Sequence, residues 1–173
     1  MVHGVTEEER NLVNAFNQYF ATHDVSGIAH RKKQHRFSSQ LCDVLVDSSI
    51  DQFYLAIEAK SVKTSSTNKL YFSQHFSENS EGHQVDRISD FIDRSGRTGY
   101  LAVELKRGTG RPRQAFLVPW RIVRRRYREN ETGIPLDLVR QQLALERTGS
   151  QYSIDPVVDQ LDSREAAFFQ RQP

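Results

Sequence analysis

Two acidic residues and one lysine have the types and spacing that could support phosphodiester hydrolysis. Asp43 lies in one apolar, β-rich run, and Glu58 and Lys60 lie two residues apart at the end of the next run. Because strand side chains alternate between two faces, we expect Glu58 and Lys60 to point to the same side. The short polar link Ser48–Asp51 predicts an antiparallel hairpin, which would bring the Asp43 and Glu58 carboxylates together at one edge of a sheet.

Such a pair of carboxylates predicts a metal site. Two converging carboxylates repel each other unless a positive charge lies between them. Mg²⁺ prefers oxygen ligands and commonly takes one or two carboxylates together with water and phosphate oxygens. We therefore expect Mg²⁺ at Asp43 and Glu58, with Mn²⁺ as a substitute and with Lys60 placed to orient water or stabilise phosphorane charge. Taken alone, Glu58 and Lys60 are better explained by a salt bridge at a strand end.

A second acid–x–lysine triplet, formed by Glu104 and Lys106, competes for the same interpretation. A partner acid should precede it by one hairpin. Asp90 and Asp93 instead fall in or after a predicted helix. We therefore expect Glu104 and Lys106 to form a surface pair.

The remaining pattern predicts the elements that position these residues. Thr6 and Glu9 have the spacing of a capping box that opens a helix. A helix is then expected over residues 6–23, followed by three strands over 24–30, 41–47 and 52–60. A second helix is expected over 82–92, followed by two strands over 99–106 and 114–120. Further helices are expected from Pro119 and over residues 136–145. This order predicts an α/β fold with a mixed central β-sheet flanked by helices.

Composition bounds the class of protein. The chain has 173 residues, of which 37% are hydrophobic, so it can bury one core; we expect one domain over residues 1–147 and a tail over 148–173. The single cysteine, Cys42, excludes an intramolecular disulfide framework and predicts a reducing, cytoplasmic location. No run reaches the roughly 18 apolar residues of a membrane span, so we expect a soluble protein.

Positive charge gathers in three segments although the net charge is only +2. The segments are His30–Arg36, Lys106–Arg113 and Arg121–Arg128. Such segregation favours a polyanionic partner such as nucleic acid, and solvated loops rich in arginine are the alternative.

Five stretches, in order, resemble the PD-(D/E)XK nuclease superfamily, and within it the archaeal-type Holliday junction resolvases and their RecU-type bacterial relatives. The stretches are EERNLV, HRKKQHRFSSQ leading into CDVLV, IEAKSVKTSS, HQVDRISDFIDRSG and FLVPWRIVRRR. Cys42 stands where the signature has proline. The resemblance implies a restriction-endonuclease-like fold and a homodimer that cuts opposing strands of four-way DNA junctions with Mg²⁺.

The resemblance also implies residue roles. Catalysis is expected at Glu9, Asp43, Glu58, Lys60 and Gln84. The implied metal ligands are Glu9, Asp43, Glu58 and the Ala59 carbonyl oxygen. DNA contacts are expected at Arg10, Arg31, Lys32, Lys33, Arg36, Ser38, Ser39 and Lys63. Glu9 is preferred to Glu8 as the first-helix acid because Arg10 follows it.

Two other functions stay open at this point. One is a restriction-type or repair endonuclease that cuts linear or branched DNA with the same site. The other is a non-catalytic DNA-binding protein on the same scaffold. Intact Asp43, Glu58 and Lys60 favour the enzymes, because a binding module needs none of the three.

Overall fold

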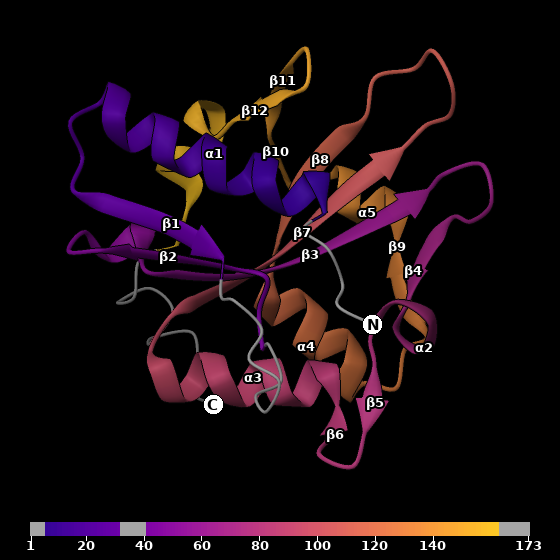
Figure 1. The fold of residues 1–173 in the computed structure, drawn as a ribbon. Helices are drawn as coiled ribbons and strands as arrows, with labels where there is room; N and C mark the ends of the chain where they lie inside the picture. The colour runs from indigo at the N-terminus through magenta and orange to yellow at the C-terminus, as the bar shows by residue number, and fades with distance from the viewer. Residues whose placement is uncertain (1–5, 32–40, 163–173) are drawn as a thin grey trace.

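The computed structural model describes residues 6–31 and 41–162. Its centre is a six-stranded sheet with the strand order β1-β2-β3-β7-β8-β10 (Figure 1). The strands are β1 (Gly27–Arg31), β2 (Val44–Ser48), β3 (Leu55–Lys63), β7 (Thr98–Lys106), β8 (Gln114–Pro119) and β10 (Leu143–Ala144). Only β3 and β7 pair in parallel, and the other neighbours are antiparallel. The expected mixed sheet flanked by helices is confirmed.

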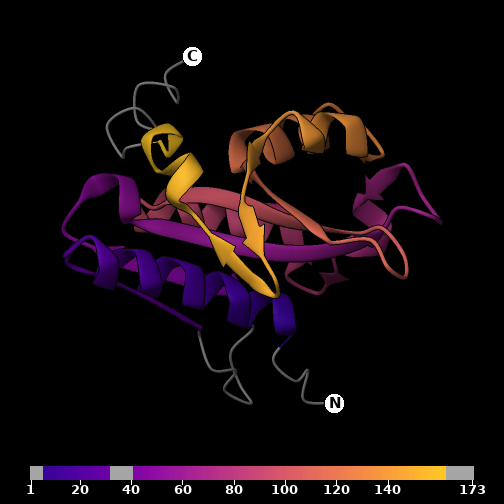
Figure 2. The same ribbon diagram turned by 90° about the horizontal axis from the view of Figure 1, so that it is seen from above.

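Different elements cover the two faces of the sheet (Figures 1 and 2). One face carries α1 (Glu7–Thr22), the hairpin of β11 (Glu146–Thr148) and β12 (Gln151–Ser153), and the short helix η2 (Asp155–Gln160). The other carries α3 (Gln84–Ser95), α4 (Trp120–Arg128) and α5 (Leu136–Arg140). The connecting elements are η1 (Asp51–Phe53), β4 (Lys69–Tyr71), α2 (Phe72–His75), β5 (Glu78–Asn79), β6 (Gly82–His83) and β9 (Gly133–Pro135).

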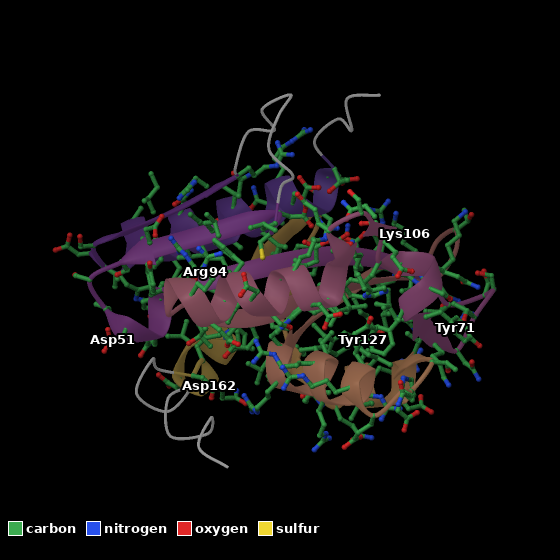
Figure 3. The ribbon with its side chains drawn as sticks, turned by 90° about the horizontal axis from the view of Figure 1, so that it is seen from below. Asp51, Tyr71, Arg94, Lys106, Tyr127 and Asp162 are labelled. Atoms are coloured by element: carbon green, nitrogen blue, oxygen red, sulfur yellow. The ribbon has the colours of Figure 1, made fainter. Side chains whose placement is uncertain are left out.

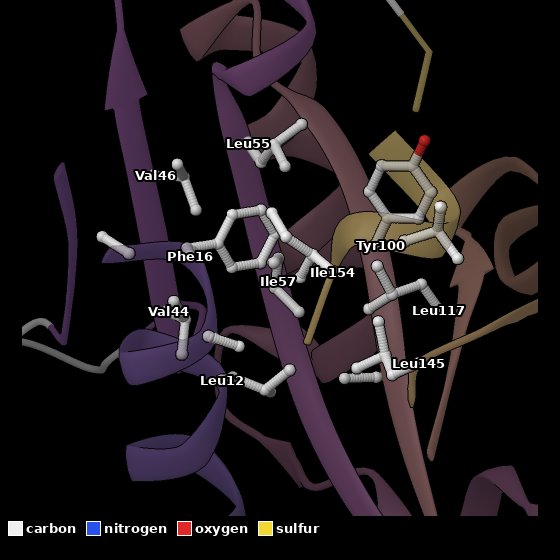
Figure 4. Packing of buried hydrophobic residues seen from close by; sticks show 14 of the residues in the cluster. Leu12, Phe16, Val44, Val46, Leu55, Ile57, Tyr100, Leu117, Leu145 and Ile154 are labelled. Atoms are coloured by element: carbon white, nitrogen blue, oxygen red, sulfur yellow. The ribbon is translucent and has the colours of Figure 1, made fainter. Parts of the chain in front are cut away.

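The core consists of two apolar layers, one on each face, because the strand side chains alternate. Leu55 and Ile57 of β3 belong to the layer under α1, whereas Ala56 and Val62 belong to the layer under α3. Figure 4 shows the first layer, in which Phe16 of α1 lies against the sheet. This alternation directs Glu58 toward the α3 face.

The predicted boundaries hold for some elements and shift for others. The Glu9 backbone N–H donates to Thr6 Oγ1 at 3.3 Å, so the predicted start of α1 is confirmed. The helix predicted over residues 136–145 instead ends at Arg140. Leu143 and Ala144 pair with the edge of β8, and this long-range pairing overrides the local helical pattern.

The C-terminal segment contributes to the core. Tyr152, Ile154, Val157, Val158 and Leu161 belong to the layer under α1. The sequence predicts few regular elements after residue 148, but β12 and η2 place these apolar side chains against the sheet. Part of the expected tail is therefore packed, as far as residue 161.

A side chain of α1 covers the outer edge of β1, which is the first strand of the sheet. The Asn17 Nδ2 donates to the Ala29 carbonyl oxygen at 2.9 Å, and the Ala29 N–H donates to Asn17 Oδ1 at 2.8 Å. One side-chain amide thus satisfies both backbone groups of Ala29. Among the helices of the described ranges, none has the length and apolar character needed to cross a bilayer.

Candidate active site

The β2–β3 hairpin sets the spacing of the two acids. The strands are antiparallel, and Val44 is paired with Ile57. Continuing that register by one residue places Asp43 opposite Glu58. The expected antiparallel hairpin is present, but Glu58 lies in the middle of the nine-residue β3 rather than at its end. The site therefore sits within the sheet, on a central strand.

Two side chains donate to the Glu58 carboxylate, and Glu58 is only 3% exposed. Lys60 Nζ donates to Glu58 Oε1 at 2.6 Å, and Gln84 Nε2 donates to the same oxygen at 2.8 Å. Lys60 Nζ also lies over the Phe76 ring, 5.0 Å from its centroid. The Gln84 amide is held in turn, because its Oε1 accepts from the Ser77 backbone N–H at 3.1 Å. Glu58 and Lys60 are thus oriented from several sides.

Asp43 and Glu58 resist simultaneous ionisation. Burial raises the pKa of Glu58 to about 8, and the Asp43 charge adds to this effect. Burial also raises the pKa of Asp43, whose Oδ2 accepts from the Ala59 N–H at 2.8 Å, and the Glu9 charge raises it further. A cation beside the two carboxyl groups would stabilise their charged forms and reduce the repulsion between them.

The donor set fits a hard cation. Asp43 and Glu58 offer carboxylate oxygens, and Ala59 between Glu58 and Lys60 offers a backbone carbonyl. Mg²⁺ is commonly held by one or two carboxylates and completes its shell with water and phosphate oxygens. In the part of the chain that the structure describes, no group of three or more His, Cys, Asp or Glu side chains is placed to hold a metal. Asp43 and Glu58 are the carboxylates that meet at this position, and the carboxylate of Glu9, also expected as a ligand, is paired with Arg31.

The first turn of α1 contributes two buried acids that face different partners. The Glu9 carboxylate accepts from Arg31 Nε at 2.7 Å, while the Glu9 backbone N–H makes the capping contact with Thr6 Oγ1. Glu8 instead accepts from Ser61 Oγ at 2.9 Å. Both acids interact with Asp43, because, in addition to burial, the Glu9 charge raises the pKa of Asp43 and the Asp43 charge contributes to the raised pKa of Glu8. The preference for Glu9 over Glu8 stays a prediction.

The residues predicted to contact DNA divide into two groups. Arg10 and Lys63 are exposed, whereas the Arg31 guanidinium is paired with Glu9. The second group lies outside the described residues and consists of Lys32, Lys33, Arg36, Ser38 and Ser39.

The competing triplet on β7 is not the expected surface pair. Glu104 is only 1% exposed, and its carboxylate accepts from Arg113 Nη1 at 3.1 Å and from the Tyr152 hydroxyl at 2.7 Å. The parallel register places Glu104 opposite Ser61. The prediction failed because the partners, Arg113 just before β8 and Tyr152 on β12, come from segments that the sequence around Glu104 does not reveal.

Phe76 and Ser77 contact the site but were not predicted from the sequence. They lie just after α2, where Phe76 contacts Lys60 and Ser77 contacts Gln84. No local pattern signals such a contact. Cys42, in contrast, is buried in the apolar layer under α3.

Comparisons with known proteins give matches among solved structures. No family model matches the chain, and neither does any curated protein. The chain is similar to the 1.6 Å structure of Archaeoglobus fulgidus Hjc, a Holliday junction resolvase from an archaeal hyperthermophile. The two are 19% identical, the match covers 90% of this chain and 97% of that chain, and the TM-score is 0.35. At this TM-score the similarity alone establishes neither family nor activity.

Proposed function

We propose that this chain is a Mg²⁺-dependent endodeoxyribonuclease of the PD-(D/E)XK type, with a restriction-endonuclease-like fold. Its proposed substrate is branched DNA, and its proposed reaction is resolution of four-way junctions by cutting opposing strands. One observation supports this most: the β2–β3 register sets Asp43 opposite Glu58, while Lys60 donates directly to Glu58. A structural salt bridge would explain the lysine but not the opposing acid.

The proposed roles follow from the contacts. Asp43, Glu58 and the Ala59 carbonyl oxygen would hold Mg²⁺, or Mn²⁺ in its place, which when bound supplies positive charge beside a phosphoryl oxygen. Gln84 orients Glu58, and Arg31 holds Glu9 beside the acids.

Lys60 is the residue proposed to act on the phosphate. Its ammonium group is fixed by Glu58 and by the Phe76 ring, and its side chain is 18% exposed. An ammonium group in such a partly desolvated position interacts more strongly with phosphate charge than it would in water. It can therefore orient water or stabilise the charge that develops on the phosphorane without a large rearrangement.

Junction resolution carries two further proposals. Symmetric cleavage of opposing strands requires two sites, so we propose a twofold-symmetric homodimer. Exposed Arg10 and Lys63 are proposed to contact phosphates near the site, which positions DNA without reading its sequence.

The test is cleavage of a synthetic four-way junction with Mg²⁺. The wild type is compared with Asp43→Asn and Lys60→Ala, and Asp47→Asn is the control because Asp47 lies on β2 with His30 and Arg97 as partners. Paired symmetric nicks that disappear in the two site variants, with junction binding retained, support the proposal. Equal cutting of linear duplex with the same arms favours a restriction-type or repair endonuclease. No cleavage of either DNA with Mg²⁺ or Mn²⁺ overturns the proposed activity.

A further inference from the structure

A second cleft lies apart from the Asp43–Glu58 site and shares none of its residues. It has a volume of about 770 Å³ and is formed by the C-terminal part of α3, the start of β7 and α4. Figure 3 views the molecule from the side of α3 and α4 and labels Asp162, one of the lining residues. A cleft of this volume is large enough for a small organic ligand.

The floor of the cleft is apolar and tightly packed. Ile92 and Trp120 are buried side chains that line it, together with Gly99. A Cβ atom at Gly99 would lie 2.3 Å from Ile92 Cδ1 and 2.8 Å from Trp120 Cβ, so only glycine permits this arrangement. Such a floor suits the ring or sugar of a ligand rather than a bare ion.

The rim of the cleft is rich in arginine. Arg121, Arg125 and Arg128 follow one another at spacings of four and three residues, so they lie along one face of α4. Arg121 is paired with Asp162. Arg125 and Arg128 are exposed, and neither forms an ion pair within residues 6–31 and 41–162. Their guanidinium groups are available to bind phosphate oxygens in bidentate geometry.

The wall of the cleft holds polar groups that lack partners. Arg124 Nη2 donates to the Ser89 carbonyl oxygen at 3.0 Å and to Asp93 Oδ1 at 3.1 Å, which fixes the guanidinium. Its Nε, and the hydroxyl of Thr98, are buried without a hydrogen-bond partner among the described residues. Unpaired buried donors are costly and uncommon in folded proteins. Both residues line this one cleft.

We propose that the cleft binds the phosphate group of a nucleotide, either free or within a nucleic-acid backbone. Arg125 and Arg128 hold the phosphate, and the apolar floor at Trp120 receives the sugar or base. Arg124 and Thr98 supply the additional polar contacts. This inference is independent of the nuclease activity proposed above, because it involves none of the residues of that site.

The single tryptophan of the chain makes the proposal directly testable. Trp120 lines the cleft, so the only indole N–H signal in a ¹H–¹⁵N NMR spectrum reports on it. Titrations without Mg²⁺ use thymidine 5′-monophosphate, a short oligothymidylate and inorganic phosphate. Binding is followed in the Asp43→Asn background, so its outcome does not depend on DNA cleavage.

A charge-matched pair of variants separates the cleft from general attraction. Arg125→Gln with Arg128→Gln removes two arginines from the rim, and Arg94→Gln with Arg140→Gln removes two arginines outside the cleft. We expect saturable shifts that weaken by about tenfold or more in the rim variant and stay unchanged in the control. Tighter binding of the oligothymidylate identifies a nucleic-acid backbone, and equal or tighter binding of the mononucleotide identifies a free nucleotide. No saturable shift with either, or equal weakening in both variants, overturns the proposal.

Discussion

Two acid–x–lysine triplets lie on neighbouring parallel strands of one sheet, and only one of them resembles an active site. Glu58 and Glu104 are both almost completely buried. Glu58 is opposite Leu101, whereas Glu104 is opposite Ser61, three residues further along. Because side chains alternate between the two faces along a strand, this offset of three residues places the two carboxylates on opposite faces of the sheet.

The two carboxylates have different partners. Glu104 has an arginine and a tyrosine hydroxyl as partners, from Arg113 and Tyr152. Glu58 has Lys60 and Gln84, but it also has a second acid, Asp43, opposite it. Glu104 also has a second acid nearby, because burial and the Glu104 charge raise the pKa of Glu8. The two triplets therefore differ in their paired partners: Glu104 has an arginine and a tyrosine hydroxyl from other segments, whereas Glu58 has Lys60 of its own triplet and the opposing Asp43.

The largest expected effect comes from neutralising Glu58. Glu58→Gln should lower the rate of junction cleavage by about a hundredfold to a thousandfold, because a proposed metal ligand is lost. Its unfolding free energy should be unchanged or higher, since the repulsion with Asp43 disappears. Single-turnover cleavage and urea unfolding measure the two effects. A variant that cleaves normally would remove Glu58 from the proposed site.

The opposite pattern is expected for Glu104. Glu104→Leu leaves Arg113 and Tyr152 without their buried partner, so the unfolding free energy should fall by about 3 kcal/mol. Cleavage by the folded fraction should stay near the wild-type rate. Urea unfolding gives the first quantity, and cleavage normalised to folded protein gives the second. A specific loss of cleavage with full stability would show that both triplets take part in the reaction.

A smaller effect is expected at the residue that orients Glu58. Gln84→Ala removes the amide donor to Glu58, and we expect about a tenfold loss of cleavage together with a higher Mg²⁺ requirement. Cleavage measured over a range of Mg²⁺ concentrations shows both. Gln142→Ala is the matched control, because among the described residues that amide donates to a carbonyl of α5 and to no residue of the site. Equal losses in both variants would contradict a specific role for Gln84.

The smallest effect concerns Asp47, a carboxylate on β2 with cationic partners and no opposing acid. Burial alone would raise its pKa, but hydrogen bonds from His30 and Arg97 outweigh burial and lower it. A lowered pKa stabilises the fold above the unfolded-state pKa of about 4, and this contribution is lost as the pH falls through the folded-state value. Asp47→Asn should cost under about 1 kcal/mol at pH 7, since the group is partly exposed.

Urea unfolding of both proteins across the acidic range checks the direction. The difference between wild type and Asp47→Asn should shrink as the pH falls below about 4. A difference that grows on acidification would mean that the Arg97 contact does not hold the carboxylate in its charged form.

Local signals predicted much of this arrangement. Thr6 marked the start of α1, the polar link at Ser48–Asp51 marked the hairpin, and strand alternation put Glu58 and Lys60 on one side. These features depend on residues close together in the chain. Hydrophobic alternation also specified which face of β3 enters each apolar layer.

The features that were not predicted correctly depend on contacts between segments that are distant in the sequence. The register between β3 and β7 determines which face Glu104 occupies, and no residue near Glu104 encodes it. The pairing of Glu9 with Arg31 likewise requires α1 to lie along β1. Long-range packing of this kind leaves no periodic signal in a single sequence, so it was seen only in the structure.

The amide of Asn17 has a consequence for how copies of this chain meet. An uncovered outer strand offers its backbone groups to the same strand of another molecule, and this is a common route to aggregation. At Ala29 those groups are already bonded to a side chain that imitates a neighbouring strand. Growth of the sheet from one molecule into the next is thus blocked at the centre of β1, which leaves self-association to other surfaces of the protein.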